Sequence, residues 1–125
     1  MALQEYVGAI VLEVDGKEVE CSSFSPHETT GRRPVRTMNR QGRVMGYCEG
    51  TASYDLAVSL PIPVDGNEPD WGRVTGAKLV IYPASGKGKR TAYTDCVVME
   101  VGECYEAEGE ARRDLTLFAT NKVKE

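Results

Sequence analysis

The chain has 125 residues, of which 41% are apolar and 27% charged, as in an ordinary globular domain and unlike a disordered or fibrous chain. Its 15 Lys and Arg against 19 Asp and Glu give a formal net charge of -4, which argues against nucleic acid as a tightly held partner. No apolar run reaches the roughly 18 residues that cross a bilayer, and residues 1–5 lack the basic start of a leader. We therefore expect one soluble domain over residues 1–125 that stays where it is synthesised.

Cysteine and histidine are too sparse to indicate a catalytic or metal centre. The cysteines are Cys21, Cys48, Cys96 and Cys104, without a C-x-x-C pair, and His27 is the only histidine. Nothing marks the chain as secreted, so reduced and mostly buried thiols are expected rather than disulfides. The sequence predicts no metal, no cofactor and no catalytic Cys/His or Ser/His pair.

The first half of the chain is predicted to form strands around a long loop. Apolar and β-branched residues over 6–14 are followed by Asp15-Gly16 and an alternating run at 17–21, which predicts a β-hairpin. Residues 25–43 are rich in turn formers and arginine, and they predict an extended basic loop.

The clearest strand signal covers residues 51–60. Tyr54, Leu56 and Val58 fall on one face, and Asp55 lies on the small polar face. We expect Tyr54, Leu56 and Val58 to anchor the core, together with Trp71, the only tryptophan.

The second half continues the strand pattern. Residues 70–76 predict a short α-helix, because Pro69-Asp70 is typical of a helix start and Gly76 of a stop. Strands are expected at 77–82, at 90–105 with a bend near Gly102, and at 115–119, followed by a flexible tail at 121–125. The predicted fold is mostly β, with two packed antiparallel sheets forming a sandwich or small barrel, one short α-helix and one long loop.

Charge is distributed unevenly along the chain. Five arginines lie within twelve residues that contain no acid: Arg32, Arg33, Arg36, Arg40 and Arg43. Six acids and no base lie between residues 95 and 110: Asp95, Glu100, Glu103, Glu106, Glu108 and Glu110. These segments either balance each other within the monomer or meet between copies in a head-to-tail contact. A third interpretation is that the arginines bind nucleic acid phosphates.

The order of several short motifs resembles that of tail tube proteins of long-tailed bacteriophages and prophages. The resemblance runs from about Tyr6 to Thr120 and rests on order, spacing and length. Its motifs are Val14-Asp15-Gly16-Lys17, Phe24-Ser25-Pro26, Gly46-Tyr47, Gly50-Thr51, Tyr54-Asp55-Leu56, Asp70-Trp71, Ala77-Lys78-Leu79, Glu108-Gly109-Glu110 and Arg113-Asp114-Leu115-Thr116-Leu117.

The resemblance implies packed β-sheets flanked by a short helix, and hexameric rings that stack into a tube around a tape measure protein. It implies a non-enzymatic virion component, assembled in the host cytoplasm, that passes the genome into the host. Its partners would be other copies, the tape measure protein, tail terminator and baseplate or tip proteins, and passing DNA, without a membrane.

The resemblance also assigns roles to the charged residues. The five arginines correspond in position to a loop that contacts the adjacent ring. A wall that lets DNA slide should be acidic or neutral, so Asp55, Asp95, Glu100 and Glu103 are candidates to line the channel. Two alternatives remain: a ring-forming tube protein of a contractile secretion system, and a small nucleic-acid-binding β-barrel.

Overall fold

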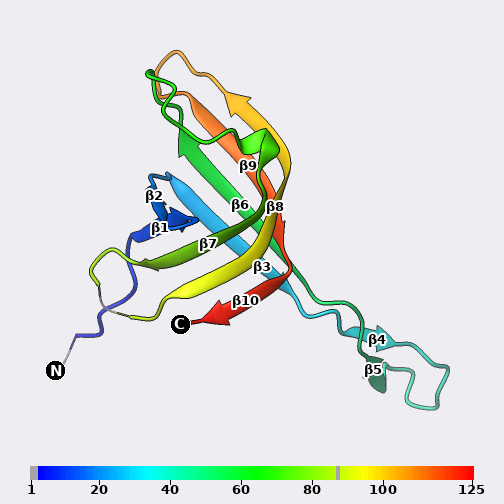
Figure 1. Ribbon diagram of the computed structural model, residues 1–125. Coiled ribbons are helices and arrows are strands. Elements are labelled where there is room, and N and C mark those ends of the chain that lie inside the picture. The colour runs from blue at the N-terminus through cyan, green and yellow to red at the C-terminus, as the bar shows by residue number, and fades with distance from the viewer. Residues whose placement is uncertain (1–2, 87) are drawn as a thin grey trace.

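The computed structural model describes residues 3–86 and 88–125, and these residues are almost entirely β-structure (Figure 1). The elements are β1 (Ile10–Val14), β2 (Lys17–Val19), β3 (Ser23–Thr29), β4 (Arg33–Val35), β5 (Gly46–Cys48), β6 (Ser53–Pro61), the 3-10 turn η1 (Trp71–Arg73), β7 (Thr75–Pro83), β8 (Thr91–Cys104), β9 (Arg112–Ala119) and β10 (Asn121–Lys124).

Eight strands form one antiparallel sheet in the order β2-β1-β7-β8-β9-β6-β3, with β10 also paired to β8. The sheet curls so that its two halves face each other (Figure 1). The 14-residue strand β8 joins the halves, because its first part pairs with β7 and β10 and its second part with β9. The predicted mostly β, antiparallel fold is confirmed, and its two packed layers belong to one continuous curled sheet. The strands β4 and β5 form a second, two-stranded sheet.

The curl coincides with irregularities in β8. Asp95 has a positive φ of 53°, and the pairing of β8 with β9 shifts register between Val98 and Glu100. Such bulges bend a strand and increase its local twist. The bend thus lies several residues before Gly102, where the sequence predicts it.

The core lies inside the curl. Leu12, Leu56, Leu79, Leu115 and Leu117 are at most 2% exposed. Burying each such side chain contributes about 1.5–3 kcal/mol.

The predicted core residues occupy this interior or its margin. Leu56, Val58 and Trp71 are buried, whereas Tyr54 is half-buried. Asp55 alternates with them and is exposed.

Three predicted segments differ in the structure. The predicted α-helix at 70–76 is wrong: only the 3-10 turn Trp71–Arg73 forms, and Asp70 makes no side-chain capping bond. The β-branched Val74 and Thr75 favour extended backbone, and Thr75 already pairs with Val97 in the sheet.

The expected tail at 121–125 forms β10 instead, which pairs with β8 at residues 91–94. The N-terminal part of the predicted 25–43 loop belongs to β3. Pro26 obscures this strand in the sequence, but β3 is an edge strand, where proline is tolerated.

Candidate self-association surfaces

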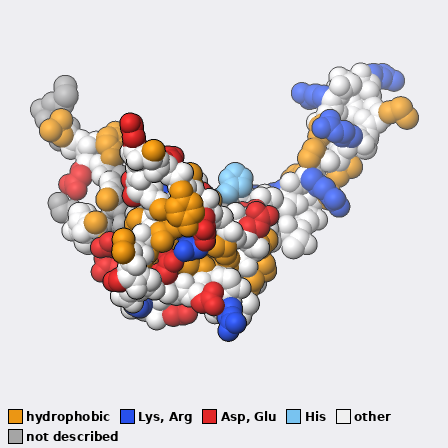
Figure 2. Space-filling model, turned by 90° about the horizontal axis from the view of Figure 1, so that it is seen from above, with side chains coloured by type: hydrophobic (Ala, Val, Ile, Leu, Met, Phe, Trp, Pro, Cys, Tyr) orange, Lys and Arg blue, Asp and Glu red, His pale blue; other side chains and the backbone are white. Residues whose placement is uncertain are grey.

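Residues 30–51 form an arm that leaves the body between β3 and β6 and projects away from it (Figures 1 and 2). Its core is the β4–β5 ladder, in which Arg33 pairs with Cys48 and Val35 with Gly46. We call this segment the basic arm.

Two glycines set the direction of the basic arm at its base. Gly31 has a φ of 84°, a conformation that L side chains rarely adopt. A Cβ on Gly50 would lie 2.5 Å from the Gly31 carbonyl oxygen. The two strands of the arm therefore approach each other closely only because both positions are glycine.

The tip of the arm is an ordered turn around Asn39. The Asn39 amide donates to the Arg43 carbonyl oxygen at 2.7 Å, and the Gly42 N–H donates to the Asn39 carbonyl oxygen at 3.1 Å. Gly42 has a φ of 66°, as tight turns require. These bonds hold Arg40 and Arg43 at the tip.

The arm is basic and apolar at once. Within the described part of the chain, Arg32 is the only one of its arginines with an ion pair, to Glu49 at 3.3 Å. Arg36, Arg40 and Arg43 are exposed without an acidic partner there. The arm also exposes five large apolar side chains: Val35, Met38, Val44, Met45 and Tyr47. Figure 2 shows blue and orange side chains together on the projection. An apolar and charged protrusion of this kind is typical of an interaction surface.

The last four acids of the 95–110 segment lie at the end of β8 and in the turn to β9, and two of them are neutralised locally; we call Glu103, Glu106, Glu108 and Glu110 the acidic turn. Arg113 binds Glu103 at 2.8 Å and Glu68 at 2.7 Å, and Arg112 binds Glu106 at 3.3 Å. The Tyr105 hydroxyl donates to Glu103 at 2.8 Å, and together with Arg113 it lowers the pKa of that carboxyl.

Four acids of the 95–110 segment have no ion pair among the described residues: Asp95, Glu100, Glu108 and Glu110.

The basic arm and the acidic turn lie at opposite ends of the body. The arm joins β6 at Ser53, whereas Pro61 at the other end of β6 pairs with Arg112, which pairs with Cys104. A nine-residue strand separates these ends by roughly 27 Å. Because the arm also points outward (Figure 1), it does not meet the acidic turn of its own chain.

The four residues predicted to line a channel do not form one cluster. Asp55 and Glu100 lie on the outer face of the sheet, because Glu100 pairs with Thr116 and Thr116 with Ala57, which shares the face of Asp55. Glu103 lies on the opposite face, opposite Arg113. Asp95 sits at the bend of β8 and accepts a bond from the Thr120 hydroxyl at 3.3 Å.

The sequence predicts the arginines of the arm as a contact surface, but it does not predict that Val35, Met38, Val44 and Met45 are exposed beside them. Residues 35–48 are only weakly strand-like in the sequence, and no buried face can be read from them.

Among the described residues, no helix is long and apolar enough to span a membrane, and no His, Cys, Asp and Glu side chains gather as they would around a metal ion.

No protein-family model and no curated protein matches the sequence. Several solved structures share its fold. A chain from the sheath/tube terminator of the extracellular contractile injection system PVC, in its extended state, is 13% identical, with a TM-score of 0.75 over 99% of both chains. A chain from the tube-terminating cap of the anti-feeding prophage is 11% identical, with a TM-score of 0.73 over 100% of this chain and 94% of that one.

The chain has the tail-tube fold. Hcp1 from Salmonella typhimurium extends the likeness, at 17% identity and a TM-score of 0.54 over 92% of this chain and 90% of that one. The predicted resemblance to tail tube proteins is thus confirmed at the level of fold. Within the tail-tube fold of this chain, the basic arm projects far from the body (Figure 1).

Proposed function

We propose that this chain is a non-enzymatic structural subunit that associates head to tail into a tube. The observation that carries the proposal is the placement of an exposed basic and apolar arm at the end of the body opposite the acidic turn. Complementary surfaces at opposite ends of one subunit make heterologous contacts, which propagate from copy to copy. The likeness to tube and cap structures supports the same arrangement.

The proposal extends to a bacteriophage tail tube of stacked hexameric rings, built in the host cytoplasm around a tape measure protein and ending at terminator and baseplate proteins. The outer face of the sheet, with Asp55 and Glu100, lines the channel in this proposal. Negative charge there repels the DNA backbone and keeps passing DNA from adhering. The arginines from Arg32 to Arg43 then face the adjacent ring.

The experiment is sedimentation velocity of the wild type and of the double variant Arg36→Glu/Arg40→Glu over a concentration series. The wild type should form species larger than the monomer, and the variant should need about tenfold more protein to do so, because like charges then face each other. A matched control, Lys89→Glu/Lys124→Glu, makes the same change in net charge on exposed body residues and should assemble normally. Unchanged assembly of the arm variant would overturn the head-to-tail proposal.

The second candidate is a tube of a contractile secretion system, which the likeness to contractile injection systems and Hcp1 favours. Genes for a tape measure protein and a capsid beside this one support the phage tail, whereas secretion genes support the alternative. A nucleic-acid-binding monomer would show salt-dependent binding to DNA without a polymer.

A further inference from the structure

Two surfaces at opposite ends of the body combine exposed apolar side chains with charge of opposite sign. One is the basic arm, on which Met38 is fully exposed beside arginines without an acidic partner among the described residues. The other is the acidic turn, beside which Tyr105 is 69% exposed. The two surfaces are therefore complementary in charge and alike in exposing apolar area.

The acidic turn keeps a net negative charge. Arg112 belongs to the last pair of the β8–β9 ladder, so residues 105–111 form the loop between these strands, and this loop contains three carboxylates and no base. The pKa of Arg112 is raised mainly by Glu106, with a smaller contribution from Glu110. Glu108 and Glu110 are exposed and have no ion pair in the part of the chain that the structure describes. A basic partner can therefore bind there without first breaking an ion pair.

Tyr105 supplies an ordered apolar surface beside these carboxylates. Its hydroxyl donates to Glu103 at 2.8 Å, and Arg113 binds the same carboxylate at 2.8 Å. The ring is thus held in place although most of it is exposed. Aromatic side chains of this kind are frequent anchors of protein interfaces, because they bury a large area at a low cost in conformational entropy.

The 62–70 loop lies against the acidic turn and helps to fix it. The Ile62 N–H donates to the Ala111 carbonyl oxygen at 3.0 Å, and Arg113 binds Glu68 at 2.7 Å. A receptor that is ordered before binding loses little conformational entropy when it is occupied.

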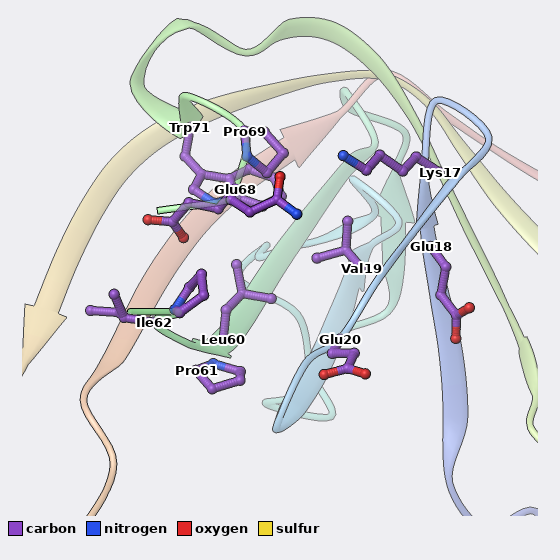
Figure 3. A pocket seen from close by; sticks show the side chains of 12 residues that line it. Lys17, Glu18, Val19, Glu20, Leu60, Pro61, Ile62, Glu68, Pro69 and Trp71 are labelled. Atoms are coloured by element: carbon purple, nitrogen blue, oxygen red, sulfur yellow. The ribbon is translucent and has the colours of Figure 1, made fainter. Parts of the chain in front are cut away.

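A cavity of about 490 Å³ between the 62–70 loop and β2 is a weaker candidate for a charged partner (Figure 3). Lys17 points into this cavity, whereas Glu18 points away from it (Figure 3). Glu68 is bound by Arg113, so the remaining charges of the lining, Lys17 and Glu20, nearly balance. The cavity therefore does not discriminate between a basic and an acidic segment.

The other exposed apolar side chains of the described residues lack a surplus of positive charge beside them. Some lie in residues 3–7, which contain one acid and no base. Val123 lies on β10 beside Lys122, which is bound by Glu28 at 3.7 Å, so Lys124 alone adds positive charge there. Three more have acidic neighbours in the chain: Val64, Met99 and Val101. Charge complementarity therefore selects the arm as the occupant of the acidic turn.

We propose that the acidic turn of one subunit is the receptor for the tip of the basic arm of a second copy of this chain, with Tyr105 as the apolar anchor. Met38 packs against the Tyr105 ring, a contact that a thioether and an aromatic ring favour. The arginines of the arm pair with Glu108 and Glu110. This inference rests on the proposed head-to-tail assembly and names the side chains that make its contact.

The test is a charge-swap rescue, read by sedimentation velocity. Glu108→Arg/Glu110→Arg alone should weaken assembly about tenfold, as the arm variant Arg36→Glu/Arg40→Glu does. Combining the two pairs of changes should restore assembly, because opposite charges then face each other again. Thermal melting checks that each variant is folded.

The matched control combines the arm variant with Asp55→Arg/Glu100→Arg. These two acids are also exposed, but they lie on the outer face of the sheet. Both combinations regain the wild-type formal net charge of -4, so a difference between them reports on the place of the charge. The control combination should assemble as weakly as the arm variant alone.

The outcomes separate the two proposals. Rescue by the turn swap and not by the sheet-face swap is the expected result. Rescue by the sheet-face swap alone, by both swaps equally or by neither overturns the acidic turn as the receptor, while head-to-tail assembly through the arm stands. An arm variant that assembles like the wild type overturns the head-to-tail assembly itself.

The apolar anchor is tested by two substitutions of Tyr105. Tyr105→Phe keeps the ring and should assemble like the wild type, whereas Tyr105→Ala should weaken assembly about tenfold. Equal assembly of these two variants would overturn the ring as the anchor. Met38→Ala should weaken assembly as well, and adding it to Tyr105→Ala should have little further effect, because the two side chains share one contact. Fully additive losses would overturn the contact between Met38 and Tyr105.

Discussion

Arg113 on β9 reaches Glu68 in the 62–70 loop, with Nη2 2.7 Å from Oε1 and both side chains at most 20% exposed. Replacing Arg113 with Met leaves the carboxylate of Glu68 uncompensated, so the free energy of unfolding should fall by about 2–3 kcal/mol. Arg112→Met breaks the far more exposed pair with Glu106 and should have a much smaller effect. Urea denaturation measures the free energy of unfolding of both variants. Equal losses of stability would contradict the conclusion that the Arg113–Glu68 ion pair stabilises the 62–70 loop.

Stability should depend on the charge of Glu103 at acid pH. The Tyr105 hydroxyl and Arg113 lower the pKa of Glu103, so its ionised form stabilises the folded state. That contribution is present above the unfolded pKa, about 4.3, and is lost as the pH falls through the lower folded value. Glu103→Gln should therefore melt below the wild type at pH 7 and approach it near pH 3. A difference in melting temperature that stays constant with pH would contradict this prediction.

The four cysteines should differ sharply in reactivity. Cys96 has no exposed surface, and burial raises its pKa to about 11, so it is a protonated and inaccessible thiol at pH 8. A chromogenic disulfide reagent should label Cys48 and Cys104 first and Cys21 more slowly, and it should reach Cys96 only in denaturant. In Cys96→Ala, denaturant should expose no further reactive thiol beyond the three that are labelled in the native protein. Rapid labelling of all four thiols in the native protein would contradict the burial of Cys96.

The close contact between Gly31 and Gly50 at the base of the basic arm predicts the effect of replacing Gly50. In Gly50→Ala the new methyl group would lie 2.5 Å from the Gly31 carbonyl oxygen, which costs about 1–3 kcal/mol of local strain. The arm should turn away and assembly should weaken, as sedimentation velocity would measure. Gly46→Ala is the matched control on the same arm, because a Cβ there meets nothing within 4 Å. Equal assembly of the two variants would show that the direction of the arm does not matter.

Local signals in the sequence predicted much of the fold. The Asp15-Gly16 turn joins β1 to β2, with positive φ at both residues, as this dipeptide favours. The alternation over residues 51–60 found β6 and its inward leucine and valine side chains. Both features depend on neighbouring residues only, so a single sequence contains them.

Features that depend on distant pairing were not predictable. β10 forms because β8 offers a partner at Thr91–Thr94, a contact that residues 121–124 do not encode by themselves. Asp95 has no pattern that marks it as the bend in β8. The cavity between β2 and the 62–70 loop joins segments some forty residues apart, so no local pattern in the sequence predicts it.

Electron microscopy of the concentrated, purified protein tests head-to-tail assembly most directly. The account predicts rings with a central channel that stack into tubes in the wild type, and no tubes in Arg36→Glu/Arg40→Glu at the same concentration. Dispersed monomers of the wild type at every concentration would contradict it.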